Sequence, residues 1–182
     1  MIRTLIIVAK KNFRDEELLF PKRLFESNNF DVTVCSEEIG TCVGVLGATV
    51  EATIELSQIN PDDYDAVVLV GGSGSLTFMN NDFMGKILEK FNECEKIISA
   101  ICIAPKILGH FGILKNRNFT IYNESETLNE EFKSFNGNYL KQNVVVDKNL
   151  ITANGAWAAE EFSKTIIEIL KDKKLVENLK NK

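Results

Sequence analysis

One cysteine of this chain stands where a nucleophile would be exposed. Cys102 lies in the sequence A-I-C-I-A-P, between an apolar run and a segment that opens with Pro105. A nucleophile on a sharp turn from strand to helix needs small neighbours because backbone and helix approach closely there, and Ala100 and Ala104 are small. Proline suits the first turn of a helix, and the positive helix end favours a thiolate, so we expect the pKa of Cys102 to lie below the usual cysteine value. The alternative is a small cysteine packed in the core.

A carboxyl group that could act beside this cysteine is Glu17, in the first amphipathic segment. Pro21, four residues later, lacks the N–H that would bond the carbonyl of residue 17, so the helix is locally distorted there. The distortion would aim Glu17 at the sheet edge where the first strand ends. The alternative is that Glu17 is one more charge of an acidic helix start, like Asp15 and Glu16, which we expect to be solvated. The residues alone favour this alternative.

A glycine pair follows another predicted strand. Gly71 and Gly72 come directly after the apolar run Ala66–Val70, and glycines there allow backbone N–H groups to face a ligand or an oxyanion. The alternative is a tight turn at the strand end. A dinucleotide fingerprint begun at Gly72 fails because Thr77 stands at its last glycine position, and no Walker lysine follows. Nucleotide binding is therefore not supported.

Metal chemistry has little support in the sequence. His110 is the only histidine, and we expect it about two turns into the helix after Cys102, away from the nucleophile. No zinc-ligand spacing is present. In a reducing compartment the cysteines would be free thiols, and these are Cys35, Cys42, Cys94 and Cys102. Trp157, at a later junction of strand and helix, is expected to pack in the core or at an interface.

Length and composition indicate an ordinary globular protein. The 182 residues, 45% of them apolar and 26% charged, predict a single domain over residues 1–182. The net charge of −5 argues against a nucleic-acid surface. The longest apolar run is far shorter than the roughly 20 residues that cross a bilayer, and the apolar stretch near the amino terminus is too short for a secretion signal. We therefore expect a cytoplasmic protein that binds neither nucleic acid nor membrane.

Short apolar runs alternate with amphipathic segments, which is typical of a doubly wound α/β protein with a parallel sheet covered on both faces. The predicted strands are Thr4–Ala9, Asp31–Cys35, Ala66–Val70, Ile97–Ile101, Phe119–Tyr122 and Val144–Thr152. The predicted helices are Asp15–Ser27, Asp82–Asn92, Pro105–Phe111 and Ala156–Lys171, followed by a short, separate, charged tail helix. Two antiparallel hairpins are expected, one over Gly40–Ala52 and one that joins Tyr139–Val146 to Leu150–Thr152.

Four of these features occur together in the order of one family. They are Glu17 in E-L-L-F-P, the glycine pair after V-V-L-V, Cys102 in A-I-C-I-A-P, and T-A-N-G before an acidic helix. The whole chain thereby resembles the ThiJ/PfpI superfamily, which includes the parkinsonism-associated protein deglycase and the PfpI-type intracellular peptidases. The resemblance implies a flavodoxin-like three-layer sandwich, similar to that of class I glutamine amidotransferases.

The resemblance also implies roles for particular residues. It makes Cys102 the nucleophile and has Glu17 hydrogen-bond its sulfur, so that the two are the expected catalytic pair. The residues that it implies for the oxyanion and substrate pocket are Gly71, Gly72, Ile103, Asn154 and Gly155. All lie where predicted parallel strands end, which is where ligands bind in open α/β sheets.

The chain departs from its relatives in its histidines. The peptidase branch has a histidine directly after the nucleophile, where this chain has Ile103. Amidotransferases use a distal histidine, and none occurs after His110. The deglycase-like branch has a histidine near the cysteine, at a place that corresponds here to Tyr122. A Cys-His hydrolase is therefore disfavoured.

Two functions from different classes remain open. The first is a cofactor-independent enzyme of glyoxalase or deglycase type, which acts on small reactive dicarbonyls such as methylglyoxal or on their adducts. The second is a non-catalytic, redox-responsive or chaperone-like stress protein, whose Cys102 is oxidised and then stabilised by a protonated Glu17. A PfpI-type peptidase is third, because Ile103 cannot act as a base. We expect no cofactor, no metal, and a homodimer or higher homo-oligomer.

Overall fold

The computed structural model describes residues 1–123 and 130–180. The α-helices in these residues are α1 (Asp15–Ser27), α2 (Asp82–Glu93), α3 (Pro105–His110), α4 (Glu130–Ser134) and α5 (Ala159–Lys180). The strands are β1 (Arg3–Ile7), β2 (Lys11–Phe13), β3 (Asp31–Ser36), β4 (Gly40–Gly44), β5 (Thr49–Ala52), β6 (Ile54–Glu55), β7 (Ala66–Leu69), β8 (Ile97–Ile101), β9 (Asn118–Phe119), β10 (Asn138–Tyr139), β11 (Val144–Asp147) and β12 (Leu150–Ala153). Short 3-10 helices cover Leu56–Gln58, Pro61–Asp63, Ser73–Asn80 and Ala156–Ala158.

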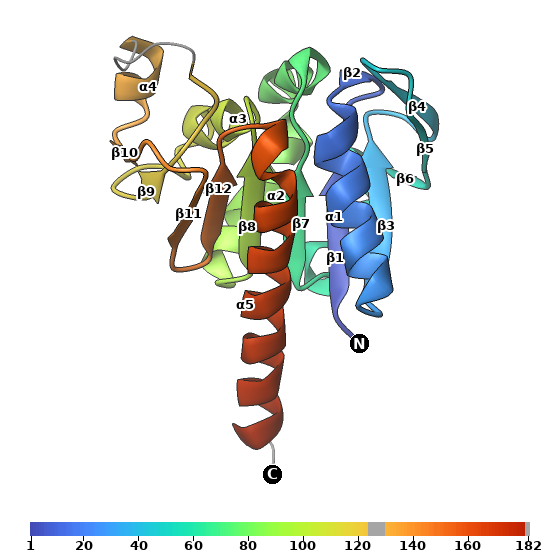
Figure 1. The fold of residues 1–182 in the computed structure, drawn as a ribbon, viewed down its shortest axis with the longest axis vertical. Coiled ribbons are helices and arrows are strands. Elements are labelled where there is room, and N and C mark those ends of the chain that lie inside the picture. The colour runs from blue at the N-terminus through green and yellow to red at the C-terminus, as the bar shows by residue number, and fades with distance from the viewer. Residues whose placement is uncertain (124–129, 181–182) are drawn as a thin grey trace.

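A seven-stranded sheet forms the middle layer of the described molecule, with the strand order β11-β12-β8-β7-β1-β3-β6. All neighbouring strands run parallel except β11, which is antiparallel to β12. Figure 1 shows α1 and α5 on one face of this sheet and α2 and α3 on the other. The predicted doubly wound α/β sandwich is confirmed.

The two faces explain why the strands are apolar throughout. In β1, Ile6 packs with the residues of α1 and α5, whereas Leu5 and Ile7 pack with those of α2 and α3. Successive side chains of a strand point to opposite faces, so a sheet covered on both sides needs apolar residues at every position. None of the helices in the described residues is long and apolar enough to span a membrane.

Both predicted hairpins are present. β4 and β5 pair antiparallel within Gly40–Ala52, and β2 joins β4 to complete a small three-stranded sheet. β11 and β12 pair antiparallel around a turn in which Lys148 has a φ of 55°. The predicted start of this second hairpin is wrong, because Tyr139 belongs to β10, which pairs with β9 in a separate two-stranded sheet.

The predicted strand Phe119–Tyr122 is also wrong in most of its length. Only Phe119 belongs to a strand, β9, which lies outside the main sheet. The backbone N–H of Thr120 donates to the hydroxyl of Thr152, at 2.8 Å, instead of to a neighbouring strand. The side-chain acceptor replaces the ladder, and the chain crosses over the carboxyl ends of the strands instead of extending the sheet.

The carboxyl-terminal helix is longer than predicted. α5 begins at Ala159 and runs without a break to Lys180, so the expected separate tail helix does not exist. No proline or glycine interrupts residues 159–180, and the charged residues there are good helix formers. The last turns of α5 extend beyond the edge of the sheet (Figure 1).

Candidate functional site

Cys102 lies on a sharp turn at the carboxyl end of β8. Its φ is +63°, in the left-handed region, which costs a residue other than glycine roughly 1–3 kcal/mol. Two backbone hydrogen bonds hold this conformation: Cys102 N–H donates to the Ala153 carbonyl at 2.9 Å, and the Cys102 carbonyl accepts from Tyr122 N–H at 2.9 Å. The chain then enters α3 at Pro105. The turn thus has the strand-to-helix geometry that the sequence pattern predicts.

Glu17 lies beside this turn, fully buried in the first turns of α1. Its Oε2 accepts a hydrogen bond from Gly71 N–H at 3.0 Å. A side chain at Gly71 would meet Glu17 Oε2 at 2.5 Å and Cys102 Cβ at 2.9 Å, so this position has no room for any residue but glycine. Gly71 therefore allows the carboxyl group and the cysteine to lie next to each other. Among the described residues, Glu17 Oε1 has no hydrogen-bond partner.

The surroundings of Glu17 raise its pKa toward neutral pH. Burial raises its pKa to about 7, although the Cys102 thiol, the Gly71 N–H and the Arg14 charge each lower it. A carboxyl group with this pKa is present in both protonation states at neutral pH. It can therefore take up a proton or release one, as a general acid and base must.

The expected low pKa of Cys102 is wrong for the resting pair. Burial raises the pKa of the thiol first, and the charge of Glu17 raises it further, while the N–H groups of Ile103 and Gly72 lower it. The helix that follows, α3, has only six residues and does not offset these effects. The thiolate is favoured when Glu17 carries the proton, because the repulsion between two negative charges is then absent. The two groups thus titrate as a pair that shares one proton.

The predicted pocket residues gather at this edge of the sheet. The N–H groups of Ile103 and Gly72 act on the sulfur of Cys102. Gly72 has a φ of +96°, and a side chain there would come within 2.4 Å of the Asn12 carbonyl oxygen. Asn154 and Gly155 follow β12, whose last residue pairs with Ile101 directly before the cysteine.

The side chain of Asn154 has an open acceptor in this place. Its Oδ1 is buried and has no hydrogen-bond partner in residues 1–123 and 130–180. The Asn154 backbone is held by its N–H, which donates to the Asn143 carbonyl at 3.0 Å. Gly155 is also restricted, because a side chain there would meet the ring of Trp157 at 2.6 Å.

An aromatic pair lies next to the sharp turn at Cys102. The rings of Tyr122 and Trp157 are 5.9 Å apart between centroids, and the Tyr122 backbone is bonded to Cys102. Trp157 is 64% exposed, so of the two expected roles the core is excluded and the interface stays a prediction.

Asp15 and Arg14, which precede Glu17 in the chain, make contacts that the sequence does not predict. Asp15 is buried, not solvated as expected: its Oδ1 accepts from Ala48 N–H at 2.7 Å and its Oδ2 from Leu46 N–H at 2.9 Å. It therefore anchors the turn of the β4–β5 hairpin. Arg14 donates its backbone N–H to the Gly71 carbonyl at 3.0 Å, and its charge acts on both Glu17 and Cys102. Neither role has a local sequence signal, because the partners lie 30 to 60 residues away in the chain.

The remaining candidates lie elsewhere. His110 is exposed at the far end of α3, with its ring against Phe111 at 4.8 Å between centroids, and lines a separate surface hollow with Lys106 and Phe135. Cys35 and Cys42 are buried, and Cys94 is exposed. No group of three or more metal-binding side chains is found among the described residues.

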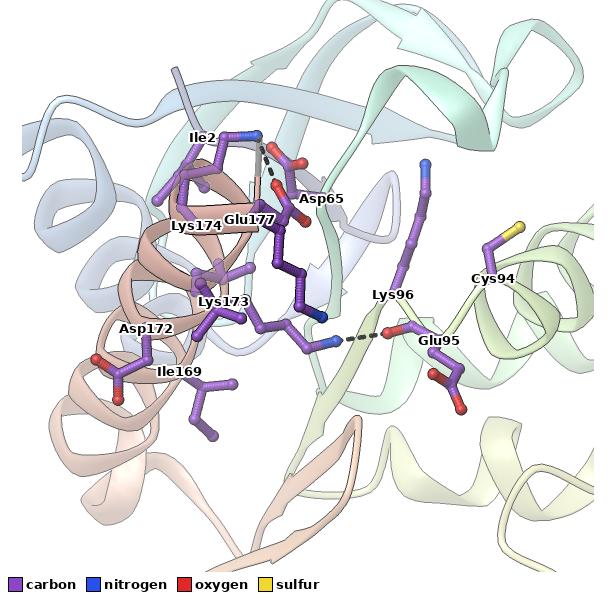
Figure 2. Close-up of a pocket in the computed structure, with 13 residues that line it drawn as sticks. Ile2, Asp65, Cys94, Glu95, Lys96, Ile169, Asp172, Lys173, Lys174 and Glu177 are labelled. Carbon is purple, nitrogen blue, oxygen red and sulfur yellow. Dashed lines mark hydrogen bonds and ion pairs between the residues drawn. The ribbon is translucent and has the colours of Figure 1, made fainter. Parts of the chain in front are cut away.

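A large cavity of about 660 Å³ lies at the opposite edge of the sheet (Figure 2). Ile2, Asp65 and Lys96, which precede β1, β7 and β8, form one wall, and the distal half of α5 forms the other. Two of the lysines in this cavity are already engaged: Lys173 Nζ donates to the Glu95 carbonyl at 2.6 Å, and Lys174 pairs with Glu177 at 3.1 Å. Because ligands of open α/β sheets bind at the carboxyl ends of the strands, the edge with Cys102 is the candidate active site.

Comparisons with known proteins agree with this architecture. A sequence model of the DJ-1/PfpI family matches residues 2–169. The Methanocaldococcus jannaschii protein MJ0967 is 41% identical over 170 residues, which are 93% of this chain and 81% of that protein. Deglycase PfpI of Pyrococcus furiosus is 26% identical over 167 residues, which are 92% of this chain and 99% of that protein.

Solved structures show the same fold. The ThiJ/PfpI domain protein from Brachyspira murdochii is similar with a TM-score of 0.88 and 30% identity, over 93% of this chain and 96% of that one. DJ-1beta of Drosophila melanogaster is similar with a TM-score of 0.80 and 26% identity, over 98% of this chain and 97% of that one.

Proposed function

Because the chain belongs to the DJ-1/PfpI family, we propose that it is a cofactor-independent, cysteine-dependent enzyme of deglycase or glyoxalase type. Its substrates are small reactive 2-oxoaldehydes such as methylglyoxal, or the adducts that these form with amines and thiols. Relatives named as deglycases, among them the Pyrococcus furiosus protein, support the deglycase type. The small-dicarbonyl substrate is our inference from the chemistry of the site.

One observation carries this proposal: Glu17, whose pKa is raised by burial to about 7, lies beside Cys102 on its strained turn. Addition of a thiol to an aldehyde requires removal of the thiol proton and delivery of a proton to the new oxygen. A carboxyl group that exchanges its proton at neutral pH can do both. This supplies the proton transfer for which related sites use a histidine.

The first step forms a hemithioacetal. Glu17 takes the thiol proton, Cys102 Sγ bonds to the aldehyde carbon, and the electron pair of the C=O bond moves to its oxygen. In this proposal the N–H groups of Gly72 and Ile103, which act on the Cys102 sulfur in the resting protein, stabilise that oxyanion, a contact worth about 3 kcal/mol per donor in other enzymes. Glu17 then returns the proton to the oxygen.

The second stage moves a proton between the two former carbonyl carbons. Glu17 removes it from the carbon bonded to sulfur and delivers it to the neighbouring carbon, and the hydroxyl proton on the first carbon passes to the oxygen of the second. One carbon is thereby oxidised to a thioester and the other reduced to an alcohol. Water then cleaves the thioester, which releases the hydroxy acid and restores the thiol. The sum is one dicarbonyl plus one water to one hydroxy acid, with no external oxidant or reductant.

The redox-responsive alternative rests on the same pair. A sulfinate formed at Cys102 by peroxide would accept a hydrogen bond from protonated Glu17, whose Oε1 has no partner within the described residues. This function requires a change of state but no turnover. A peptidase lacks support because Ile103 occupies the place of the histidine in that branch of the family.

Turnover of methylglyoxal tests the proposal directly. The purified protein should consume methylglyoxal and release lactate, followed by NMR, without glutathione or added metal. Cys102→Ser and Glu17→Ala should each remove nearly all of this activity, and the double variant should lose no more than either single one, because the two groups act as a unit. Cys94→Ser, which changes an exposed thiol, should retain it.

Three results would contradict the proposed function. They are full activity in Cys102→Ser, a requirement for glutathione or metal, and an absence of turnover in a protein whose Cys102 is readily oxidised by dilute peroxide. The last result would favour the redox-responsive alternative.

A further inference from the structure

Arg14 lies beside the candidate active site, between β2 and α1. Its backbone is fixed there because its N–H donates to the Gly71 carbonyl at 3.0 Å. The turn at Gly72 also lies close to Arg14, because a side chain at Gly72 would be 2.6 Å from the Arg14 backbone nitrogen. This contact places the Arg14 backbone next to the edge of the sheet at which Glu17 and Cys102 lie together.

The guanidinium group of Arg14 retains capacity to bind an anion. Its side chain is 39% exposed and donates from Nε and Nη2 to the Glu16 carboxylate, at 2.8 and 3.0 Å. It makes no other side-chain hydrogen bond to the described residues, and a guanidinium has five N–H donors. Glu16 is itself 34% exposed, so it can turn toward solvent when a competing carboxylate arrives.

Two neighbouring cations, Lys10 and Lys106, bind other partners. Lys10 Nζ donates to the Ile39 carbonyl at 2.9 Å, beside the β4–β5 hairpin. Lys106, in the first turn of α3, pairs through its Nζ with Glu131 of α4 at 2.7 Å. By contrast, the charge of Arg14 acts on both reacting groups, Glu17 and Cys102. Of these three cations, Arg14 is therefore the one whose charge reaches the reacting pair.

We infer that Arg14 forms a carboxylate subsite next to Cys102, and that the site prefers 2-oxoaldehydes that carry a carboxylate over neutral ones of similar size. The guanidinium fork binds a carboxylate through two parallel hydrogen bonds, as it already does with Glu16. In this arrangement Glu16 occupies the subsite of the resting protein, and a substrate carboxylate replaces it. The substrate preference rests on the proposed function, whereas the anion subsite itself does not.

Alkylation of Cys102 tests the subsite without any turnover. Iodoacetate and iodoacetamide are nearly equal in size and differ in charge, and in both reactions the sulfur displaces iodide to form a C–S bond. The ratio of their rates at Cys102, followed by mass spectrometry in a Cys94→Ser background, cancels any change in the thiolate fraction. Arg14→Gln should lower the iodoacetate-to-iodoacetamide ratio by about three- to five-fold, and Glu16→Gln should raise it by about two-fold.

Two further variants complete the test. Arg14→Lys keeps a positive charge without the fork and should give a ratio between those of the parent and Arg14→Gln. Arg23→Gln removes a cation further along α1, which lies over the ring of Phe20, and should leave the ratio unchanged. An unchanged ratio in Arg14→Gln, or an equal decrease in Arg23→Gln, would overturn the subsite.

Turnover then tests the substrate preference. The value of kcat/KM for 4,5-dioxopentanoate, a 2-oxoaldehyde with a carboxylate, should exceed that for 2-oxopentanal, a neutral 2-oxoaldehyde with the same number of carbons, and Arg14→Gln should reverse this order. A parent protein that turns over neither compound but shows the expected alkylation ratios would refute the proposed function and leave the subsite standing. Normal turnover with a preference that Arg14→Gln does not alter would refute the inference alone.

Discussion

At the scale of single residues, the site is governed by one proton held between two buried groups. Burial raises the pKa of Glu17 and the pKa of Cys102, and the charge of Glu17 raises the pKa of Cys102 further, whereas the Cys102 thiol lowers the pKa of Glu17. The surroundings that limit this effect are the Arg14 charge and the N–H groups of Gly71, Gly72 and Ile103, while Glu16 adds to it. The reactivity of the thiol is therefore set by the protonation of its neighbour.

This coupling predicts that reactivity and catalysis separate in Glu17→Gln. Glutamine keeps an acceptor for the Gly71 N–H but carries no charge, so the pKa of Cys102 should fall and the alkylation rate should reach its midpoint at lower pH. Turnover of methylglyoxal should fall by at least about a hundred-fold, because glutamine cannot exchange a proton. Iodoacetamide kinetics against pH and an NMR assay measure the two effects. If the alkylation rate of Cys102 and the turnover of methylglyoxal both rose, or both fell, the shared-proton interpretation would be contradicted.

The same carboxyl group predicts how stability depends on pH. The folded-state pKa of Glu17 is about 7 against a reference value of 4.5, so folding favours the protonated form. The stabilisation is fully present below the reference pKa and is lost as the pH rises through the folded-state pKa. Converted by the free energy per pKa unit, the loss is about 3 kcal/mol.

Urea unfolding of Glu17→Gln checks this dependence. The variant should exceed the parent in its free energy of unfolding at about pH 8, and the two should agree at about pH 4, because glutamine stays neutral throughout. Equal stabilities at both pH values would show that Glu17 is not buried as described.

At the scale of elements, α1 positions two different parts of the molecule through neighbouring residues. Glu17 faces the turn after β7, whereas Asp15 bonds the turn between β4 and β5. Gly44 makes the second contact possible, because a side chain there would lie 2.6 Å from the Asp15 carboxylate. The amino end of α1 thus joins the hairpin to the edge that carries the candidate active site.

The hairpin should loosen when this anchor is removed. Asp15→Ala leaves the N–H groups of Leu46 and Ala48 without their charged acceptor, which should lower the free energy of unfolding by about 2–3 kcal/mol. Limited proteolysis should then cut within residues 45–48, and urea unfolding should show the loss. Asp172→Ala, which removes an exposed carboxylate from α5, is the control and should change neither. Resistance to proteolysis in Asp15→Ala would mean that the β4–β5 pairing holds the hairpin unaided.

At the scale of the whole molecule, several apolar side chains remain exposed, and two regions contain more than one of them. One is the hairpin region, with Ile39, Val45 and Leu46, and the other is the distal part of α5, with Leu175 and Leu179. Figure 1 shows these regions at different ends of the molecule. Exposed apolar groups of this kind are typical of association surfaces.

We expect the protein to form at least a homodimer. Light scattering at micromolar concentration should give at least twice the mass of the chain, and Leu46→Glu should reduce it if the hairpin is the contact. A strict monomer in the parent would contradict this prediction. An assembly that persists in Leu46→Glu but dissociates in Leu179→Glu would place the contact on α5 instead.

The sheet and the helices on its two faces could be predicted from the sequence, because unbroken apolar runs are stable only where helices cover both faces. The sequence also predicted the turn at Cys102, since the small residues and the proline around it are local signals. Three properties became visible only in the folded structure. Glu17 is buried rather than solvated, Asp15 binds a distant hairpin, and the pKa of Cys102 is raised. Those properties arise from groups far apart in the chain that meet in a low dielectric, and no local pattern records such a meeting.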